Sequence, residues 1–229
     1  MSTESTLVSR TLWARGGKRA FDVVAASVLL LLLSPVLLLA AFFVKLTSRG
    51  PLFFAQKRVG RNGVIFQVRK FRTMRADRRP DPKELVPLDH PDITPVGRLL
   101  RRLKIDELPQ IAHVLTGEMS LVGPRPTLPD QVEAYDDFRR QRLLARPGIT
   151  GLAQVNGNTS VPWDERILFD IAYVRRYSLA MDLGVLLRTV LALILGEART
   201  TRPFHTTRYV TYVTPPEGYR DGSSDHSEK

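Results

Sequence analysis

The chain has 229 residues, of which 43% are hydrophobic, and this excludes a wholly disordered protein while allowing one sizeable domain with an anchor or a tail. It contains no cysteine, which excludes disulfides, thiolate metal sites and a cysteine nucleophile. The net charge is +11, and residues 1–80 alone carry +12, with 15 Lys and Arg against 3 Asp and Glu. A basic surface suits nucleic acid, anionic lipid or a phosphorylated small molecule.

The first predicted element is the apolar run within residues 21–46, which is long enough to cross a bilayer core of about 30 Å. Ser34 and Pro35 lie near its middle. Pro35 has no amide hydrogen for the carbonyl of Leu31, so we expect a kink there, and the Ser34 hydroxyl can bond a carbonyl one turn earlier. Basic residues flank both ends, and such flanks prefer the cytoplasm. The pattern favours a re-entrant helix broken at Ser34-Pro35, and a single spanning helix is the alternative.

A β-hairpin is predicted next, because Asn62-Gly63 between two apolar-rich runs is typical of a type I′ turn. Alternation along the second strand places these residues on one face: Val64, Phe66, Val68, Lys70 and Arg72. We expect the three apolar residues to belong to the core. The two cations at the end of this face need an anion, which either a structural carboxylate or a substrate phosphate would supply.

The segment after a polar, proline-rich loop predicts two helices. In the first, Leu99, Leu100 and Leu103 share a face among arginines, which is typical of a helix at the lipid interface. The second starts near the acidic pair Asp106-Glu107 and ends at Gly117.

Two roles are open for the acidic pair. Asp106 is a plausible helix N-cap, and Glu107 a favourable first-turn charge. Alternatively, Asp106 attacks a phosphorus atom bound at the helix N-terminus, while Glu107 manages protons or helps to hold a metal.

Two later loops present arginines between rigid neighbours. Arg125 is flanked by prolines, and Arg146 precedes a proline and several glycines. A guanidinium that is held in place suits a phosphate or a nucleobase edge, and a surface turn is the alternative reading of both loops. Residues 163–195 have a helical pattern, and their apolar final part is too short to span a bilayer.

Seven sequence blocks in order resemble one known family. They are KRAFD…SP at 18–35, GPLFFAQKRVGRNG at 50–63, KFRTM at 70–74, KIDELPQ at 104–110, GEMSLVGPRP at 117–126, RPGITGLAQVNG at 146–157 and YVRRYSLAMDL at 173–183. Over about residues 17–198 the chain resembles the bacterial sugar transferases, which are monotopic phosphoglycosyl transferases.

The resemblance implies transfer of a sugar 1-phosphate from a UDP-sugar to polyprenyl (undecaprenyl) phosphate with release of UMP. This step starts the assembly of exopolysaccharide, capsule, O-antigen or glycoprotein glycans. It implies that Asp106 is the nucleophile of a covalent phosphosugar-aspartyl intermediate, and that Glu107 assists as a base or in binding Mg²⁺. It also implies a substrate-binding surface made of Lys70, Arg72, Arg125 and Arg146.

The expected fold is α+β and mostly helical, with a re-entrant membrane hairpin, a small cytosolic domain with a β-hairpin, and amphipathic interfacial helices. The expected parts are a basic segment (1–20), the membrane helix (21–46), the catalytic domain (47–200) and a partly disordered tail (201–229). We expect a monotopic protein of the bacterial cytoplasmic membrane, in contact with anionic lipids and with its active site on the cytoplasmic face. Nucleic acid is not an expected partner. The alternative function is a non-catalytic, membrane-tethered basic protein that binds nucleic acid or acts as a scaffold.

Overall fold

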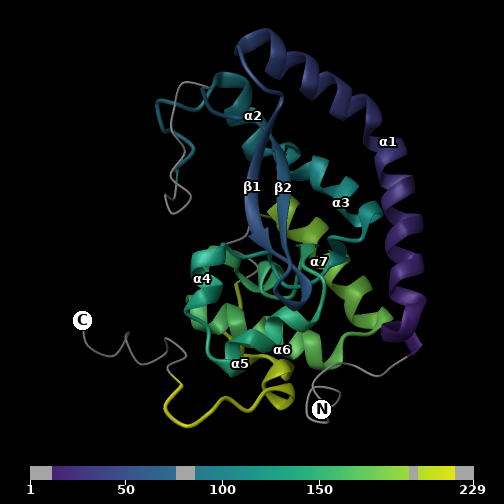
Figure 1. Cartoon of the computed structure of the whole chain (residues 1–229), viewed down its shortest axis with the longest axis vertical. Coiled ribbons are helices and arrows are strands. Elements are labelled where there is room, and N and C mark those ends of the chain that lie inside the picture. The colour runs from purple at the N-terminus through teal and green to yellow at the C-terminus, as the bar shows by residue number, and fades with distance from the viewer. Residues whose placement is uncertain (1–11, 76–85, 196–200, 220–229) are drawn as a thin grey trace.

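The computed structural model describes residues 12–75, 86–195 and 201–219 (Figure 1). Its helices and strands are α1 Lys18–Thr47, β1 Phe53–Val59, β2 Ile65–Phe71, α2 Pro95–Arg102, α3 Ile111–Thr116, β3 Ser120–Val122, α4 Pro129–Glu133, α5 Asp137–Arg140, β4 Gly148–Thr150, α6 Trp163–Arg176 and α7 Leu179–Leu195. Short 3-10 turns connect several of them, and the strands form one antiparallel pair, β1-β2, and one parallel pair, β3-β4. The mostly helical α+β class is therefore confirmed for the described residues.

The helix α1 lies along one side of the molecule and bends about midway along its length (Figure 1). It is one continuous helix of 30 residues with Pro35 inside it, so the predicted break is a bend. The Ser34 hydroxyl donates a hydrogen bond of 2.8 Å to the carbonyl of Leu31, the group that Pro35 leaves without its amide partner. Most of the apolar surface of α1 is exposed, and its length and composition suit a membrane span.

The first half of α1 is attached to the rest of the protein by buried polar contacts. The Asp22 carboxylate accepts a hydrogen bond of 2.7 Å from Ser120 at the start of β3. Lys18 forms an ion pair of 2.9 Å with Asp182 of α7, and the hydroxyl of Tyr173 from α6 donates to the same carboxylate at 2.6 Å. These partners come from β3, α6 and α7, so three elements fix this end of the helix.

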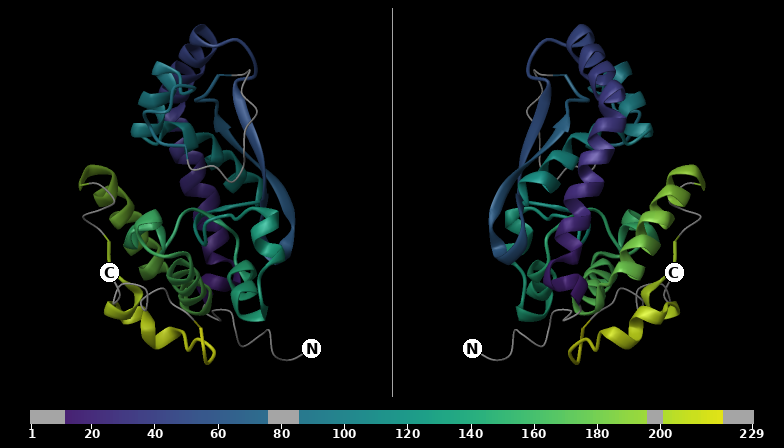
Figure 2. Two further views of the ribbon diagram at one scale, coloured as in Figure 1. Left: turned by 90° about the vertical axis from the view of Figure 1, so that its left-hand side faces the viewer. Right: turned by 90° about the vertical axis from the view of Figure 1, so that its right-hand side faces the viewer.

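The second half of α1 packs on a different part of the same body. Ala40 and Val44 are buried in a small cluster with Phe71 at the end of β2 and Leu100 of α2. Both ends of the long apolar helix therefore contact one folded unit (Figure 2).

The predicted β-hairpin is confirmed, but its turn is longer than expected. Pairing ends at Val59 opposite Ile65, so residues 60–64 form a five-residue connection. Asn62 and Gly63 have φ of 57° and 82°, as their sequence suggested, within this wider loop.

The structure corrects one expectation about a buried side chain. Val64 is 66% exposed because it lies in the loop, before β2 begins, whereas Phe66 and Val68 are buried as predicted. Of the three leucines predicted to share a face, Leu100 is buried, whereas Leu99 and Leu103 remain 55% and 54% exposed, as suits the predicted interfacial helix.

The centre of the protein is α6, which is enclosed on nearly all sides. Its Phe169 contacts the rings of Phe204 and Tyr209, with centroid separations of 5.0 and 6.2 Å. Both partners lie in the segment from 201 to 213, which we predicted to belong to a tail. The buried aromatic side chains instead make this segment part of the core, while residues 220–229 lie outside the described residues.

Candidate functional site

The acidic pair lies in a 3-10 turn, Ile105–Gln110, that leads directly into α3. Lys104 occupies the N-cap position of this turn with a left-handed φ of 57°, so of the two open readings of Asp106 the helix N-cap does not hold. Asp106 instead lies in the first turn and is 9% exposed. The helix ends at Gly117 in the left-handed conformation, as predicted.

Glu107 is paired with two of the predicted cations. Its Oε1 lies 2.5 Å from Lys70 Nζ and 3.3 Å from Arg125 Nη2. Burial alone would raise the pKa of Glu107, but Arg125 and Lys70 outweigh burial and hold it well below its ordinary range. Glu107 is therefore an anion at any physiological pH, and a carboxylate is the partner of Lys70 in this structure.

The neighbouring Asp106 is in the opposite electrostatic situation. Burial and the charge of Glu107 raise its pKa to about 6, although Lys70, Arg101 and Lys104 favour the charged form. No described residue hydrogen-bonds its carboxylate. Asp106 is thus an ionisable carboxylate that is partly desolvated and incompletely neutralised, which is a property of reactive carboxylates.

Close backbone packing places Arg101 beside Asp106. A Cβ atom at Gly97 would lie 2.0 Å from the carbonyl oxygen of Thr73, so α2 rests directly on the chain that leaves β2. Arg101, one turn later in α2, donates from Nε to the Thr73 hydroxyl at 2.9 Å. Glycine is required at position 97 because any side chain would displace α2.

The loop that carries Arg125 is held by the parallel strand pair. The amide of Gly123 donates to Thr150 at 2.9 Å, and the amide of Gly148 donates to Pro124 at 2.9 Å. A Cβ at Gly148 would lie 2.1 Å from the nitrogen of Gly123. The two proline- and glycine-rich motifs of the sequence therefore pack backbone against backbone.

A buried ion pair also holds the loop of Arg125 in place. Arg142 pairs with Asp170 of α6 and donates to the hydroxyl of Tyr135 at 2.7 Å. It also donates to the backbone carbonyl of Arg125 at 3.1 Å. Sequence reasoning missed Arg142, since it lies in an irregular charged stretch without periodicity.

The other two predicted substrate-binding arginines lie elsewhere. Arg72 is buried at the junction of α1 and β1, where it donates to the carbonyl of Ser48 at 2.6 Å.

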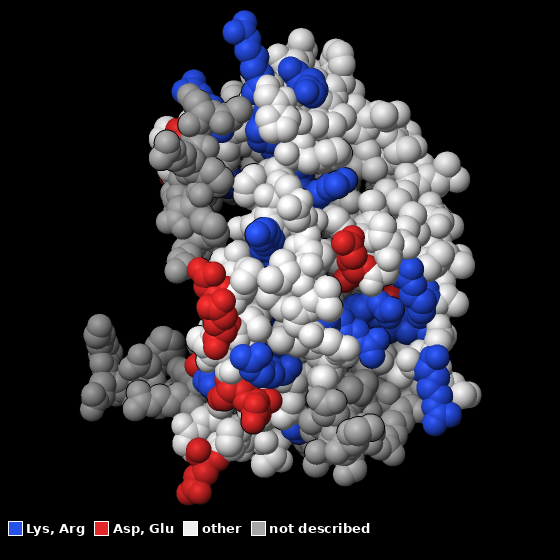
Figure 3. Space-filling model, viewed as in Figure 1, with Lys and Arg blue, Asp and Glu red and all other residues white. Residues whose placement is uncertain are grey.

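Arg146 donates to the carbonyl of Gly117 at 2.9 Å, at the end of α3 opposite to the acidic pair. Arg19 bonds the carbonyl of Leu115 at 3.0 Å at the same helix end. Burial, Arg61 and Arg19 lower the pKa of Arg146. Figure 3 shows basic side chains gathered between the hairpin loop and α1.

One site residue was missed by sequence reasoning, which treated Arg58 as part of the basic flank of the membrane helix. Arg58 lies in β1 opposite Phe66, and its Nη1 donates to the carbonyl of Pro126 at 3.2 Å. Burial and Arg125 lower its pKa to about 10, against the effect of Glu107. Setting Val59 opposite Ile65 in the predicted hairpin would have placed Arg58 within the paired part of β1, opposite Phe66.

The profile of the family described as bacterial sugar transferase matches residues 13–196. This match includes every element of the site described above. The chain belongs to the bacterial sugar transferase family. The family resemblance of the sequence blocks is thereby confirmed.

Three relatives of this sugar transferase illustrate the range. It is 42% identical over 194 residues to the exopolysaccharide production protein ExoY of Rhizobium meliloti, which covers 78% of this chain and 86% of ExoY. It is 46% identical over 191 residues to the UDP-glucose:undecaprenyl-phosphate glucose-1-phosphate transferase of Caulobacter vibrioides. That match covers 77% of this chain and 69% of the Caulobacter protein. It is 39% identical over 187 residues to the undecaprenyl-phosphate galactose phosphotransferase of Salmonella typhimurium. That match covers 75% of this chain and 39% of the Salmonella protein.

The residues of this sugar transferase fit a metal that is shared with a ligand. No group of three or more His, Asp or Glu side chains able to hold an ion occurs among the described residues. Magnesium in proteins is commonly held by one or two carboxylates together with substrate phosphates and waters. Asp106 and Glu107 supply two adjacent carboxylates, and the first has no hydrogen-bond partner among the described residues. This donor set suits Mg²⁺ bound together with a phosphate.

Proposed function

We propose that this protein transfers a sugar 1-phosphate from a UDP-sugar to polyprenyl phosphate, releases UMP, and thereby starts the assembly of a bacterial surface glycan. The family membership and the transferase activities for which the Caulobacter and Salmonella relatives are named support this reaction class. The observation that carries the proposal is the unequal acidic pair. Glu107 is paired directly with Lys70 and Arg125, whereas the cations near Asp106 do not outweigh its burial and the charge of Glu107.

In the first half of the proposed reaction, a carboxylate oxygen of Asp106 attacks the sugar-bearing phosphorus of the donor. The bond from this phosphorus to the bridging oxygen breaks, and UMP leaves with the electron pair. The product is a phosphosugar-aspartyl enzyme. The raised pKa of Asp106 indicates a poorly stabilised anion, which is a better nucleophile than a carboxylate held by several hydrogen bonds.

In the second half, an oxygen of polyprenyl phosphate attacks the same phosphorus and Asp106 leaves as a carboxylate. This restores the enzyme and gives polyprenyl diphosphate sugar. Arg58, Lys70 and Arg125 surround the pair and provide positive charge for the phosphates of the donor. Mg²⁺ held by Asp106 and Glu107 would offset the charge of the diphosphate.

We further propose that α1 enters the cytoplasmic membrane and returns to the same face. A helix that crossed the bilayer would have its ends on opposite sides. Here Lys18 near one end is paired with Asp182, and Val44 near the other end is packed against Leu100, in the same folded body. The exposed leucines of α1 and α2 would then lie in lipid, and the basic flanks on the cytoplasmic face beside anionic headgroups.

The reaction is tested with the purified protein in nanodiscs, supplied with Mg²⁺, polyprenyl phosphate and a panel of UDP-sugars. We expect UMP release with at least one donor. With donor radiolabelled in the sugar and no acceptor, label should remain on wild-type protein and be absent from Asp106→Asn. The matched control is Asp136→Asn, since Asp136 is an exposed N-cap of α5, for which Asn is a good substitute. Failure to release UMP from any donor would refute the proposed function.

A further inference from the structure

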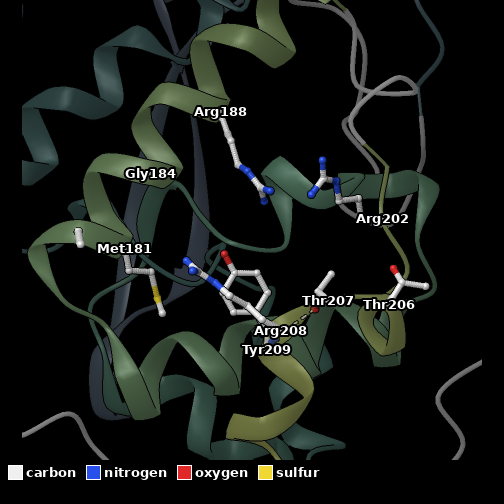
Figure 4. Close-up of a pocket in the computed structure, with 9 residues that line it drawn as sticks. Met181, Gly184, Arg188, Arg202, Thr206, Thr207, Arg208 and Tyr209 are labelled. Carbon is white, nitrogen blue, oxygen red and sulfur yellow. Dashed lines mark hydrogen bonds between the residues drawn. The ribbon is translucent and has the colours of Figure 1, made fainter.

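A second basic site lies away from the acidic pair, between α7 and the segment from 201 to 213. It is a pocket of about 430 Å³, and its walls include Arg188, Arg202, Thr206, Thr207, Arg208 and Tyr209. Figure 4 shows the guanidinium groups of Arg188 from α7 and Arg202 from the C-terminal segment facing the same space, while the Arg208 side chain extends along the pocket toward Met181. No Asp or Glu is among the residues of the described chain that line it.

The C-terminal wall of this pocket is fixed by the core. The amide of Phe204 donates to the buried carboxylate of Glu165 at 3.0 Å, and Tyr209 packs on Phe169. The amide of Arg202 donates to the carbonyl of Asn156 at 2.9 Å. The backbone at Arg202 and Arg208 is therefore held in place before any ligand arrives.

The α7 wall is also preorganised. The side chain of Asn156 is fully buried, and its amide nitrogen donates to the carbonyl of Leu152 at 2.7 Å. Its Oδ1 accepts a hydrogen bond of 3.1 Å from Arg188 Nη1. This contact directs the Arg188 guanidinium toward the pocket, as Figure 4 shows.

The chemistry of the walls favours an anion. The hydroxyls of Thr206 and Thr207 donate within their own turns, to the carbonyls of Pro203 and Phe204 at 2.8 Å. The main donors into the pocket are therefore guanidinium groups, which match phosphate oxygens in charge and geometry. A bound phosphate would pair with these positive charges, and no carboxylate among the described lining residues competes with it.

We propose that this pocket binds a phosphate group, carried either by an anionic lipid headgroup or by a phosphorylated solute. Its volume lies in the range of small-ligand sites. The adjoining face of α7 exposes Leu183, Leu187 and Ile194, so a lipid that is seated in the pocket can continue along this face. The site lies partly outside the matched family region, because Arg202 and Arg208 follow residue 196.

The test uses full-length protein in nanodiscs and follows amide hydrogen exchange in residues 201–213. One arm adds inorganic pyrophosphate to phosphatidylcholine nanodiscs, and the other replaces part of the phosphatidylcholine with phosphatidylglycerol. Amides that exchange only while the pocket is empty should exchange about tenfold more slowly when the free ligand is at roughly ten times its Kd. Protection in the first arm identifies a solute phosphate, and protection in the second identifies a headgroup.

The variant Arg202→Gln/Arg208→Gln should lose this protection, since both side chains are exposed and their removal leaves the core intact. The matched control Lys57→Gln/Arg140→Gln removes two exposed positive charges from β1 and α5, outside the pocket, and should keep the protection. Absence of protection in both arms, or equal protection in the variant and the control, would overturn the proposal. UMP release does not enter this test, so it is independent of the proposed function.

Discussion

At the scale of single residues, the site depends on two adjacent carboxylates with different environments. Glu107 has two cationic partners within 3.3 Å, and Asp106 has only longer-range attraction to set against its burial. The same backbone turn therefore presents one carboxylate that is paired with cations and one that is only partly compensated, which is the basis of their proposed roles. Two substitutions test these separate roles.

Removing the charge of Asp106 should stabilise the fold while it abolishes UMP release. The pKa of Asp106 is raised from 3.8 to about 6, so its ionised form disfavours the folded state above pH 6 by about 3 kcal/mol. This penalty disappears as the pH falls below 4, where the carboxyl is protonated in both states. Thermal unfolding of Asp106→Asn should therefore occur above that of wild type at pH 8, with a smaller difference at pH 4. Equal melting temperatures at both pH values would contradict the assignment of Asp106 as a desolvated carboxylate.

Removing the charge of Lys70 should weaken the reaction without unfolding the protein. Hydrogen bonds to charged groups contribute about 1.5–3 kcal/mol, so Lys70→Gln should lower kcat/KM for the UDP-sugar by roughly ten- to a hundredfold. Lys57 on the partner strand is exposed and provides the control, because Lys57→Gln should retain activity within about twofold of wild type. Similar losses in both variants would indicate a general effect of charge on membrane or substrate association.

At the scale of elements, the site is positioned by contacts between segments that are distant in sequence. Helix α6 reaches the loop of Arg125 through the buried pair of Arg142 and Asp170, and α2 reaches the acidic turn through Gly97 and Arg101. The proposed site residues Lys70, Glu107 and Arg125 lie on a strand, a 3-10 turn and a loop, and contacts with α2 and α6 hold the turn and the loop in place.

The pair formed by Arg142 and Asp170 separates stability from positioning. Either Arg142→Met or Asp170→Leu alone leaves a buried charge unpaired and should lower the free energy of unfolding by about 3–5 kcal/mol. The double variant removes both charges and should recover most of this stability. Because Arg142 also holds the Arg125 carbonyl, kcat/KM in the double variant should stay several-fold below wild type. Full recovery of both properties would mean that the pair has no positioning role.

At the scale of the whole molecule, the sequence predicted the order of elements better than their contacts. The hairpin, the helix that ends at Gly117 and the helical pattern of residues 163–195 follow from local pattern, and the last of these is present as two helices, α6 and α7. Pairing of Glu107 with Lys70 and Arg125 was only partly foreseeable, because all three were recognised as charged motif residues without a known geometry. Arg146 illustrates the limit, since its motif resembles that of Arg125 but its loop position directs it to the far end of α3.

Other differences also arise from long-range packing. Val64 fits the alternation of β2, but the five-residue connection leaves it outside the strand. The segment from 201 to 213 mixes polar residues with Phe204, Tyr209 and Val213, and its contacts with the core, including Phe169, explain their burial. Neither the loop length nor these aromatic contacts leave a periodic signal in the sequence.

The position of α1 relative to the whole body predicts one topology. A single engineered cysteine near residue 10, in a chain that has no other cysteine, should resist a membrane-impermeant thiol reagent added to intact cells. The same cysteine should react after the cells are lysed.

Replacing Pro35 with Leu restores the amide of a straight helix. We expect this change to reduce UMP release, because the two ends of α1 would no longer fit their contacts. Labelling of the cysteine near residue 10 in intact cells, in a chain that keeps Pro35, would refute the re-entrant arrangement.

The double attachment of α1 has a mechanical consequence. Lys18 and Val44 connect its two ends to the same body, and the helix packs along α2 and α3, which flank the acidic turn. The helix therefore cannot rise or sink in a bilayer by itself, and Asp106 must move with it. The height of the nucleophile above the acyl chains would then follow the thickness of the lipid leaflet, and lipid chain length would tune the encounter with a long-chain acceptor.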